Sequence, residues 1–176
     1  VSPSTLPRTH TNTQVIHRMF RTIFDGLERD FAAELRVVRE QYPSEPVQFT
    51  EQPLVIHWEE GMELLRSAGC TDQGPWDDLS SANELLLGQV VKEKYGSDFF
   101  IMDRYPSDIR PFYTMPSPDD ARHSNSYDIF IRGQEICSGA QRCHDSGMLE
   151  ARIAVRTLQF LSSRALVAYV THTRIT

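Results

Sequence analysis

The chain has 176 residues and a mass of 20.2 kDa, the size of one ordinary domain or of part of a larger one. It is 40% hydrophobic and 24% charged with a mean hydropathy of −0.40, which excludes a disordered, collagen-like or membrane-embedded chain. No run of about 18 apolar residues is present, and the N-terminus lacks the apolar stretch of a secretory signal. We therefore expect a cytoplasmic protein with no membrane partner.

Charge and cysteine content exclude further classes of protein. The net charge of −6 argues against a chain that coats nucleic acid over its whole surface, while a local RNA contact stays open. Residues 146–176 carry a net charge of +3, so the remainder carries −9. The three cysteines include no CxxC pair, and we interpret them as reduced thiols rather than disulfide partners or zinc ligands.

The N-terminal part predicts a leader followed by a long helix. Residues 1–13 have the proline- and threonine-rich composition of a flexible leader. Apolar residues then recur every three or four positions from Gln14 to Gln41, which predicts an amphipathic helix with one stripe facing a core. Tyr42-Pro43 ends it. The stripe comprises Val15, Met19, Ile23, Leu27, Phe31, Leu35 and Val38.

The next segments predict a strand over 54–58 and a helix over 59–68. Ser81-Ala82-Asn83-Glu84 has the spacing of a capping box, in which Ser81 and Glu84 satisfy free backbone donors at a helix start. This third helix is expected to run to Tyr95, with Gly96 as its stop.

Short β-rich runs follow Gly96, and each is predicted to be a strand. Arg132-Gly133-Gln134 separates the last two and predicts a tight antiparallel hairpin. Helical spacing returns from Met148 to about Val170. The predicted strands are 99–102, 111–113, 127–131 and 135–140.

The densest polar cluster lies on the predicted hairpin, at Asp128, Glu135, Ser138 and Arg142. Their oxygens suit a hard cation, and the forked guanidinium suits a carboxylate, so the set favours an anionic substrate with Mg²⁺. Ser138 and Arg142 have the same strand parity, whereas Glu135 has the opposite parity unless a bulge at Gly139 shifts the register. The alternative, that these residues only form the solvent face of an edge hairpin, stays open at this point.

Long segments of the chain resemble one family. The segments SNSYDIFIRGQEICSGAQRCHD, IRPFYTMPSPDD and DLSSANELLLGQVVKEKYGSDFFIMDRYP, with the preceding helices, are similar to class II aspartyl-tRNA synthetases of the eukaryotic and archaeal type. The resemblance covers roughly Val15 to Asp145. It implies an incomplete α+β fold of the class II synthetase type, with an antiparallel sheet flanked by helices. Residues 14–145 would be a partial catalytic domain. Residues 146–176 are expected to be a divergent helical tail.

The resemblance also implies residue roles. The position of Glu135 binds Mg²⁺ and the ATP phosphates, and that of Ser138 contributes to both metal and aspartate binding. Arg142 matches the arginine that holds the aspartate side chain, since a planar fork binds a carboxylate and rejects the amide of asparagine. Asp128 matches a second acidic position near the metal. Arg110 is interpreted as either a buried partner of a sheet carboxylate or a residue that fixes strand register.

The implied activity is ATP-dependent activation of L-aspartate and its transfer to tRNA(Asp), with ATP and Mg²⁺ as cofactors. Two arginine motifs that hold ATP in this family are found neither before Val15 nor after Asp145. We therefore expect a truncated catalytic domain that is inactive alone and works with a longer synthetase chain or as a homodimer. The charge change near Ser146 suggests an unrelated tail. A non-catalytic, synthetase-like binding or regulatory protein is the alternative.

Overall fold

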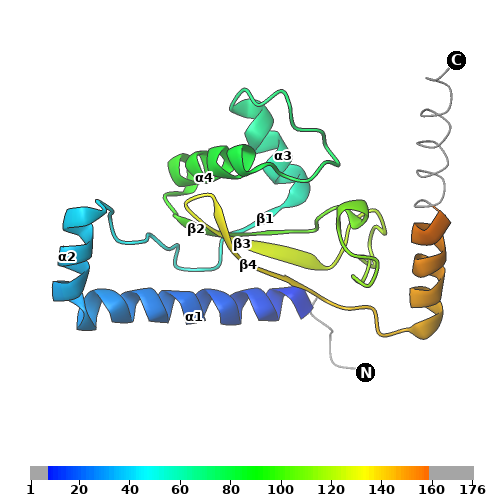
Figure 1. Ribbon diagram of the computed structural model, residues 1–176, viewed down its shortest axis with the longest axis horizontal. Coiled ribbons are helices and arrows are strands. Elements are labelled where there is room, and N and C mark those ends of the chain that lie inside the picture. The colour runs from blue at the N-terminus through cyan, green and yellow to red at the C-terminus, as the bar shows by residue number, and fades with distance from the viewer. Residues whose placement is uncertain (1–7, 159–176) are drawn as a thin grey trace, which may run out of the picture.

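A four-stranded sheet forms the centre of the computed structural model, which describes residues 8–158 (Figure 1). The strands lie in the order β1-β2-β3-β4. The α+β class is confirmed, but the sheet is mixed, because β1 and β2 are parallel and only the other pairs are antiparallel. The parallel pair needs a crossover, and two helices supply it. The strands are β1 Val55–His57, β2 Phe99–Asp103, β3 Ser126–Ile131 and β4 Gln134–Ala140.

Helices cover both faces of this sheet: α3 and α4 lie on one side and α1 on the other (Figure 1). Residues 146–158 form a further helix, which confirms the helical character predicted for this part of the tail; residues 159–170 of that prediction lie outside the described residues. Within residues 8–158, no helix has the length and apolar character needed to cross a bilayer. The named helices are α1 Arg8–Asp30, α2 Ala32–Gln41, α3 Trp58–Ser67, α4 Ser81–Tyr95 and the short 3₁₀ helix η1 Ser107–Ile109.

The larger core lies between the sheet and the α3–α4 pair. The rings of Phe100 and Phe130 stack with centroids 4.9 Å apart, and those of Trp58 and Tyr105 also lie 4.9 Å apart. The buried Trp58 donates its indole N–H to the Pro75 carbonyl at 2.8 Å, so its polar atom is satisfied. This core covers the α3–α4 face of the sheet.

The buried face of α1 differs from the predicted stripe. Residues Val15, Met19, Ile23, Leu27 and Phe31 are 38–53% exposed. The helix instead buries His17 and packs Ile16 and Phe20 against the sheet, where the His17 ring lies 5.7 Å from that of Phe99. The two stripes are one residue, or about 100°, apart on the helix, and the aromatic surface of the sheet selects the second.

The N-terminal helical segment also has different boundaries. Helix α1 begins at Arg8, so residues 8–13 of the predicted leader are helical, while residues 1–7 lie outside the described part of the chain. The predicted continuous helix over 14–41 is broken at Phe31, whose backbone has φ −127° and ψ 30°. An ion pair between Glu28 and Arg39 joins α1 to α2 across this break.

Helix α4 begins one residue earlier than the capping box predicts. Ser80 is the N-cap, and its hydroxyl accepts from the Asn83 backbone N–H at 3.3 Å. Glu84 is therefore not part of a capping box. The predicted stop is confirmed, since Gly96 has φ 69° in the left-handed region.

The strand predicted at 111–113 is absent from the structure. The Thr114 N–H instead bonds the Pro111 carbonyl at 2.9 Å and closes a turn, and Pro111 itself has no N–H to give to a ladder. Only a single bridge, from Thr114 to Arg142, links this region to the end of the hairpin.

Candidate functional site: the β3–β4 hairpin

The β3–β4 hairpin positions the predicted site residues, and its turn packs against α4. Arg132 and Gly133 have φ angles of 54° and 75°, the pattern of a type I′ turn whose twist suits a tight hairpin. A Cβ on Gly133 would lie 2.6 Å from the Glu84 carbonyl oxygen and 2.7 Å from the Leu85 Cα, so only glycine permits this approach. The first turn of α4 thus lies directly on the hairpin.

A β-bulge resolves the parity of the site residues. Phe130 pairs with Glu135 and Ile129 with Cys137, which leaves Ile136 as the extra residue. The bulge that changes the parity of Glu135 is therefore at Ile136 and not at Gly139, the position considered from the sequence. Asp128 pairs with Ser138 beyond the bulge. Since directly opposed residues share a face, Asp128, Glu135 and Ser138 all lie on the α3–α4 side of the sheet.

Asp128 is held by Arg110. The carboxylate is 4% exposed, and its Oδ2 accepts a hydrogen bond from the Arg110 guanidinium, which lies 3.8 Å above the centre of the Tyr105 ring. Of the two interpretations of Arg110, the structure shows the buried partner of a sheet carboxylate. Tyr105 could not be predicted from the sequence, since nothing in the spacing places a ring beneath Arg110.

Three polar atoms in this group have no hydrogen-bond partner within the described protein: Tyr105 Oη, Arg110 Nε and Asp128 Oδ1. Burial and the charge of Asp128 raise the pKa of the Tyr105 hydroxyl well above its ordinary value, so this phenol stays protonated. Because buried polar groups are nearly always satisfied, Asp128 Oδ1 is available to a water or a cation.

Acidic side chains gather around Glu135. Partial burial, followed by the charge of Asp128, raises the pKa of the Glu135 carboxyl above its usual value, while Arg110 and a hydrogen bond with Ser138 oppose the change. Burial and the charge of Glu135 likewise raise the pKa of Glu84. Asp78 adds to the negative potential at both groups. A bound cation would relieve this repulsion.

These residues fit a Mg²⁺ ion. No three His, Cys, Asp or Glu side chains among the described residues form a closed metal cage. Mg²⁺ does not require one, because it keeps several waters and takes one or two carboxylates together with substrate phosphates. Asp128 Oδ1 and the Glu135 carboxylate supply two such groups on one face.

Arg142 lies two residues beyond β4, in the bridge with Thr114. Its guanidinium carbon lies 5.2 Å from the centre of the Tyr113 ring. No carboxylate within the described chain pairs with Arg142, so its guanidinium fork is free to bind an anion. The structure therefore brings Asp128, Glu135 and Ser138 together and places Arg142 further along the same hairpin.

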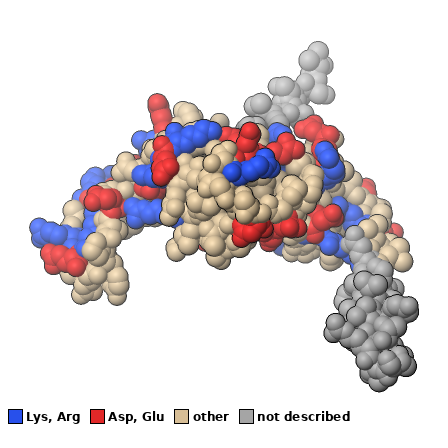
Figure 2. Space-filling model, turned by 90° about the horizontal axis from the view of Figure 1, so that it is seen from above, with Lys and Arg blue, Asp and Glu red and all other residues tan. Residues whose placement is uncertain are grey.

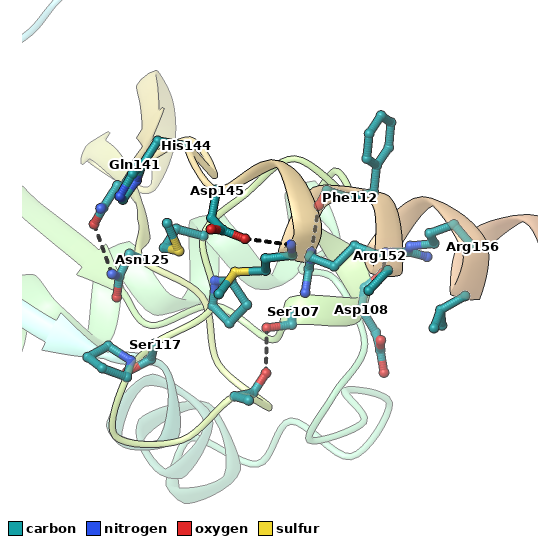
Figure 3. A pocket seen from close by; sticks show the side chains of 17 residues that line it. Ser107, Asp108, Phe112, Ser117, Asn125, Gln141, His144, Asp145, Arg152 and Arg156 are labelled. Carbon is teal, nitrogen blue, oxygen red and sulfur yellow. Dashed lines mark hydrogen bonds between the residues drawn. The ribbon is translucent and has the colours of Figure 1, made fainter.

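A separate cavity of about 820 Å³ lies between residues 107–125 and the helix at 146–158 (Figure 3). Its walls are mainly apolar and include Phe112 and Met148. Arg152 donates to the Phe112 carbonyl at 2.6 Å and Arg156 to the Asp108 carbonyl at 2.6 Å, and these bonds hold the helix in place. None of the four predicted site residues lines this cavity.

Basic and acidic side chains are interspersed on the face shown in Figure 2. This face therefore lacks the continuous basic tract expected of a surface that binds nucleic acid by charge alone. The chemistry of the hairpin, two carboxylates on one face and an unpaired guanidinium further along, instead suits a small anionic ligand with a cation.

The comparisons with known proteins identify the class. A family model described as "tRNA synthetases class II (D, K and N)" matches residues 8–170, and the chain belongs to this family. The match extends past Asp145 into the segment that the sequence analysis expected to be divergent.

Several relatives with high identity to this chain are aspartate–tRNA ligases. The chain is 52% identical over 130 residues to the cytoplasmic aspartate–tRNA ligase of Homo sapiens, covering 74% of this chain and 26% of that protein. It is 47% identical over 143 residues to the cytoplasmic enzyme of Caenorhabditis elegans, covering 81% of this chain and 27% of that protein. The structure of an aspartyl tRNA synthetase from Entamoeba histolytica matches with a TM-score of 0.80 and 43% identity, covering 86% of this chain and 31% of that one. The chain thus spans about a quarter of the length of these curated relatives.

Proposed function

We propose that this chain is part of the catalytic domain of an aspartate–tRNA ligase and carries its aspartate and cation subsites. One observation supports the proposal above the others: the bulge at Ile136 gathers Asp128, Glu135 and Ser138 on one face, with an unpaired Arg142 further along the hairpin. The similarity to aspartate–tRNA ligases favours this function over a non-catalytic binding protein.

In this proposal, Arg142 binds the side-chain carboxylate of L-aspartate and Ser138 contributes a hydroxyl beside it. A guanidinium donates two parallel hydrogen bonds to a carboxylate, and the neutral amide of asparagine leaves one of them without an acceptor. Arg142 rests near the Tyr113 ring, which limits the orientations of its fork. Selectivity for aspartate over asparagine follows from this geometry.

Asp128, Glu135 and Ser138 hold Mg²⁺ in this proposal, and Glu135 also faces the ATP phosphates. When bound, Mg²⁺ neutralises phosphate charge during activation of the amino acid. Arg110 fixes the Asp128 carboxylate through Oδ2 and so keeps Oδ1 directed to the cation. The protein's own contribution is this orientation of charged groups before the ligands arrive.

The complete reaction, transfer of aspartate to tRNA(Asp), belongs to the longer protein that the relatives represent. We propose that residues 14–145 act there as part of the catalytic domain, within a longer synthetase chain or a homodimer. The helix at 146–158 adds support, because its arginines bind the backbone of the segment that contains Arg110. The names of the relatives favour the cytoplasm as its compartment.

Calorimetric titration of the chain with L-aspartate tests the proposal. We expect L-aspartate to bind with at least tenfold preference over L-asparagine, since mispairing one polar group in such a site costs about that much or more. Arg142→Ala removes the fork and should abolish aspartate binding. Arg36→Ala, which removes an exposed guanidinium from α2, is the matched control and should leave binding unchanged.

The result that contradicts the proposal is a folded chain, with a cooperative melting transition, that releases no heat with L-aspartate. Equal binding of aspartate and asparagine would contradict the role of Arg142 specifically. A parallel titration with Mg²⁺-ATP checks Glu135, because Glu135→Gln should weaken nucleotide binding more than aspartate binding.

A further inference from the structure

Glu84 has a position that its capping-box motif does not explain. With Ser80 as the N-cap of α4, Asn83 occupies the third helical position, and its backbone N–H donates a hydrogen bond to the Ser80 hydroxyl oxygen. A capping box needs its glutamate at that third position, but Glu84 occupies the fourth. The Glu84 carboxylate makes no hydrogen bond within the described chain, so its role lies elsewhere.

The packing of α4 on the hairpin brings Glu84 to the acidic site. Gly88 lies one turn after Glu84, and a Cβ on Gly88 would collide with the backbone of Gly133. The Glu84 carbonyl itself touches the position where Gly133 would carry a Cβ. Since residues four apart share a helix face, Glu84 points along the face that contacts the hairpin, where Glu135 lies two residues beyond Gly133. Its side chain is half-buried there.

Glu84 on α4 and Glu135 on β4 thus lie on elements that contact each other, and no ion pair among the described residues involves either carboxylate. After burial, the charges of Glu135 and Asp128 raise the pKa of the Glu84 carboxyl. The charge of Asp128 likewise raises the pKa of the Glu135 carboxyl. The single arginine of the cluster, Arg110, is engaged by Asp128 Oδ2. Asp128 Oδ1 is buried and has no hydrogen-bond partner among the described residues, so this carboxylate can still take an added positive charge.

We infer that Glu84 is a further acidic group of the cation site formed by Asp128 and Glu135, and that it holds a hydrated divalent cation through the cation's water. Mg²⁺ keeps several of its waters, so a carboxylate outside direct contact still accepts hydrogen bonds from them. This arrangement agrees with the lack of a closed three-ligand cage among residues 8–158. The inference rests on the proposed cation site and adds a residue from a different element to it. Glu84 is thus a positioning residue.

Binding of Mn²⁺ alone, followed by the electron paramagnetic resonance signal of the free ion, tests this inference. We expect Glu84→Gln to weaken Mn²⁺ binding about tenfold, the usual effect of losing an outer carboxylate. Glu135→Gln should weaken it more. Glu93→Gln, an exposed position on the same helix, is the matched control and should have no effect. Glu84→Asp keeps the charge and should restore most of the affinity.

The outcomes separate the two proposals. If Glu135→Gln abolishes Mn²⁺ binding and Glu84→Gln leaves it unchanged, the inference about Glu84 is overturned and the proposed site stands. If neither variant changes Mn²⁺ binding, the proposed cation site itself is overturned.

A measurement on the unaltered chain covers the case in which Glu84→Gln fails to fold. In protein with ¹³C-labelled glutamate, Mg²⁺ should shift the carboxyl resonances of Glu84 and Glu135 with one common affinity, while that of Glu93 stays in place. A shift at Glu135 with none at Glu84 would overturn the inference.

Discussion

Arg110 illustrates how one residue supports the site without touching a ligand. Its guanidinium lies on the Tyr105 ring and donates to Asp128 Oδ2, and its side chain is 18% exposed. The pair places two opposite charges in a region from which water is largely excluded. Removing one partner of such a pair leaves the other charge buried without compensation, which is more costly than losing the attraction itself.

Arg110→Met should therefore destabilise the chain by about 3 kcal/mol, because Asp128 is left as an unpaired buried carboxylate. Urea unfolding followed by circular dichroism measures this difference. The double variant Arg110→Met/Asp128→Asn should recover a large part of the loss, since the buried charge is then gone. Equal destabilisation in the single and double variants would contradict the ion-pair explanation.

The types of the site residues are predictable from the sequence, but their arrangement is not. Asp128, Glu135, Ser138 and Arg142 are chosen by their chemistry and by resemblance, and three of them do share a face. The position of the bulge determines whether Glu135 lies on the same face as Asp128 and Ser138. No residue in the hairpin specifies Ile136 over Gly139 by itself, because a bulge depends on how both strands pack against α4.

At the scale of elements, α1 shows why periodicity alone chooses the wrong face. The helix has two apolar stripes, and the longer one, Val15 to Leu27, has the stronger pattern. The face that is buried instead contains His17, a polar residue that a hydrophobic pattern does not count. Aromatic rings on β2 and at Phe49 surround His17 and decide the orientation of α1.

His17 should make the attachment of α1 dependent on pH. Burial, with help from the charge of Arg21, lowers the pKa of His17 below its ordinary value, while a hydrogen bond with the Thr50 backbone opposes the change. The unfolded chain therefore takes up a proton at His17 before the folded chain does, and stability falls as pH drops below about 6.5.

We expect the melting temperature of the chain to fall further between pH 7 and pH 5 than that of His17→Phe does, because only the unaltered chain has a buried histidine to protonate. Differential scanning calorimetry at both pH values measures it. Identical pH dependence in the two proteins would show that His17 is not the titrating group.

The strands and most helices are predictable because their signals are local. The capped and glycine-terminated helix α4 lies within one residue of its predicted start, and β2 and β3 appear where aromatic and β-branched residues cluster. Strand β4 has only one such residue, Ile136, and follows from the tight turn at Arg132-Gly133. The strand prediction for residues 111–113 is wrong for an equally local reason, since Pro111 has no N–H to donate to a neighbouring strand. Parallel pairing of β1 with β2 required knowledge of the crossover, which no local signal carries.

At the scale of the whole molecule, the exposed stripe of α1 agrees with the short span of the chain. An isolated domain rarely leaves a continuous apolar row in water, and the chain spans about a quarter of its curated relatives. In the longer proteins, additional sequence is available to cover such a row.

The chain should therefore self-associate at concentrations of tens of micromolar through this stripe. Ile23→Glu, in the middle of the row, should shift the sedimentation profile towards the monomer without lowering the melting temperature, because Ile23 is 48% exposed. Arg18→Glu, an exposed charge reversal elsewhere on α1, controls for the added carboxylate. A monomeric unaltered chain at these concentrations would contradict the prediction.

The attachment of the helix at 146–158 has a consequence for sequence divergence. Arg152 and Arg156 bind carbonyl oxygens of Asp108, Arg110 and Phe112, groups that every amino acid possesses. A change of side chain at 108 or 112 in a homologue therefore leaves these hydrogen bonds in place, whereas replacing Arg152 or Arg156 removes them. Among related genes, we expect the variation to accumulate on the accepting segment and the constraint to remain on the donating helix.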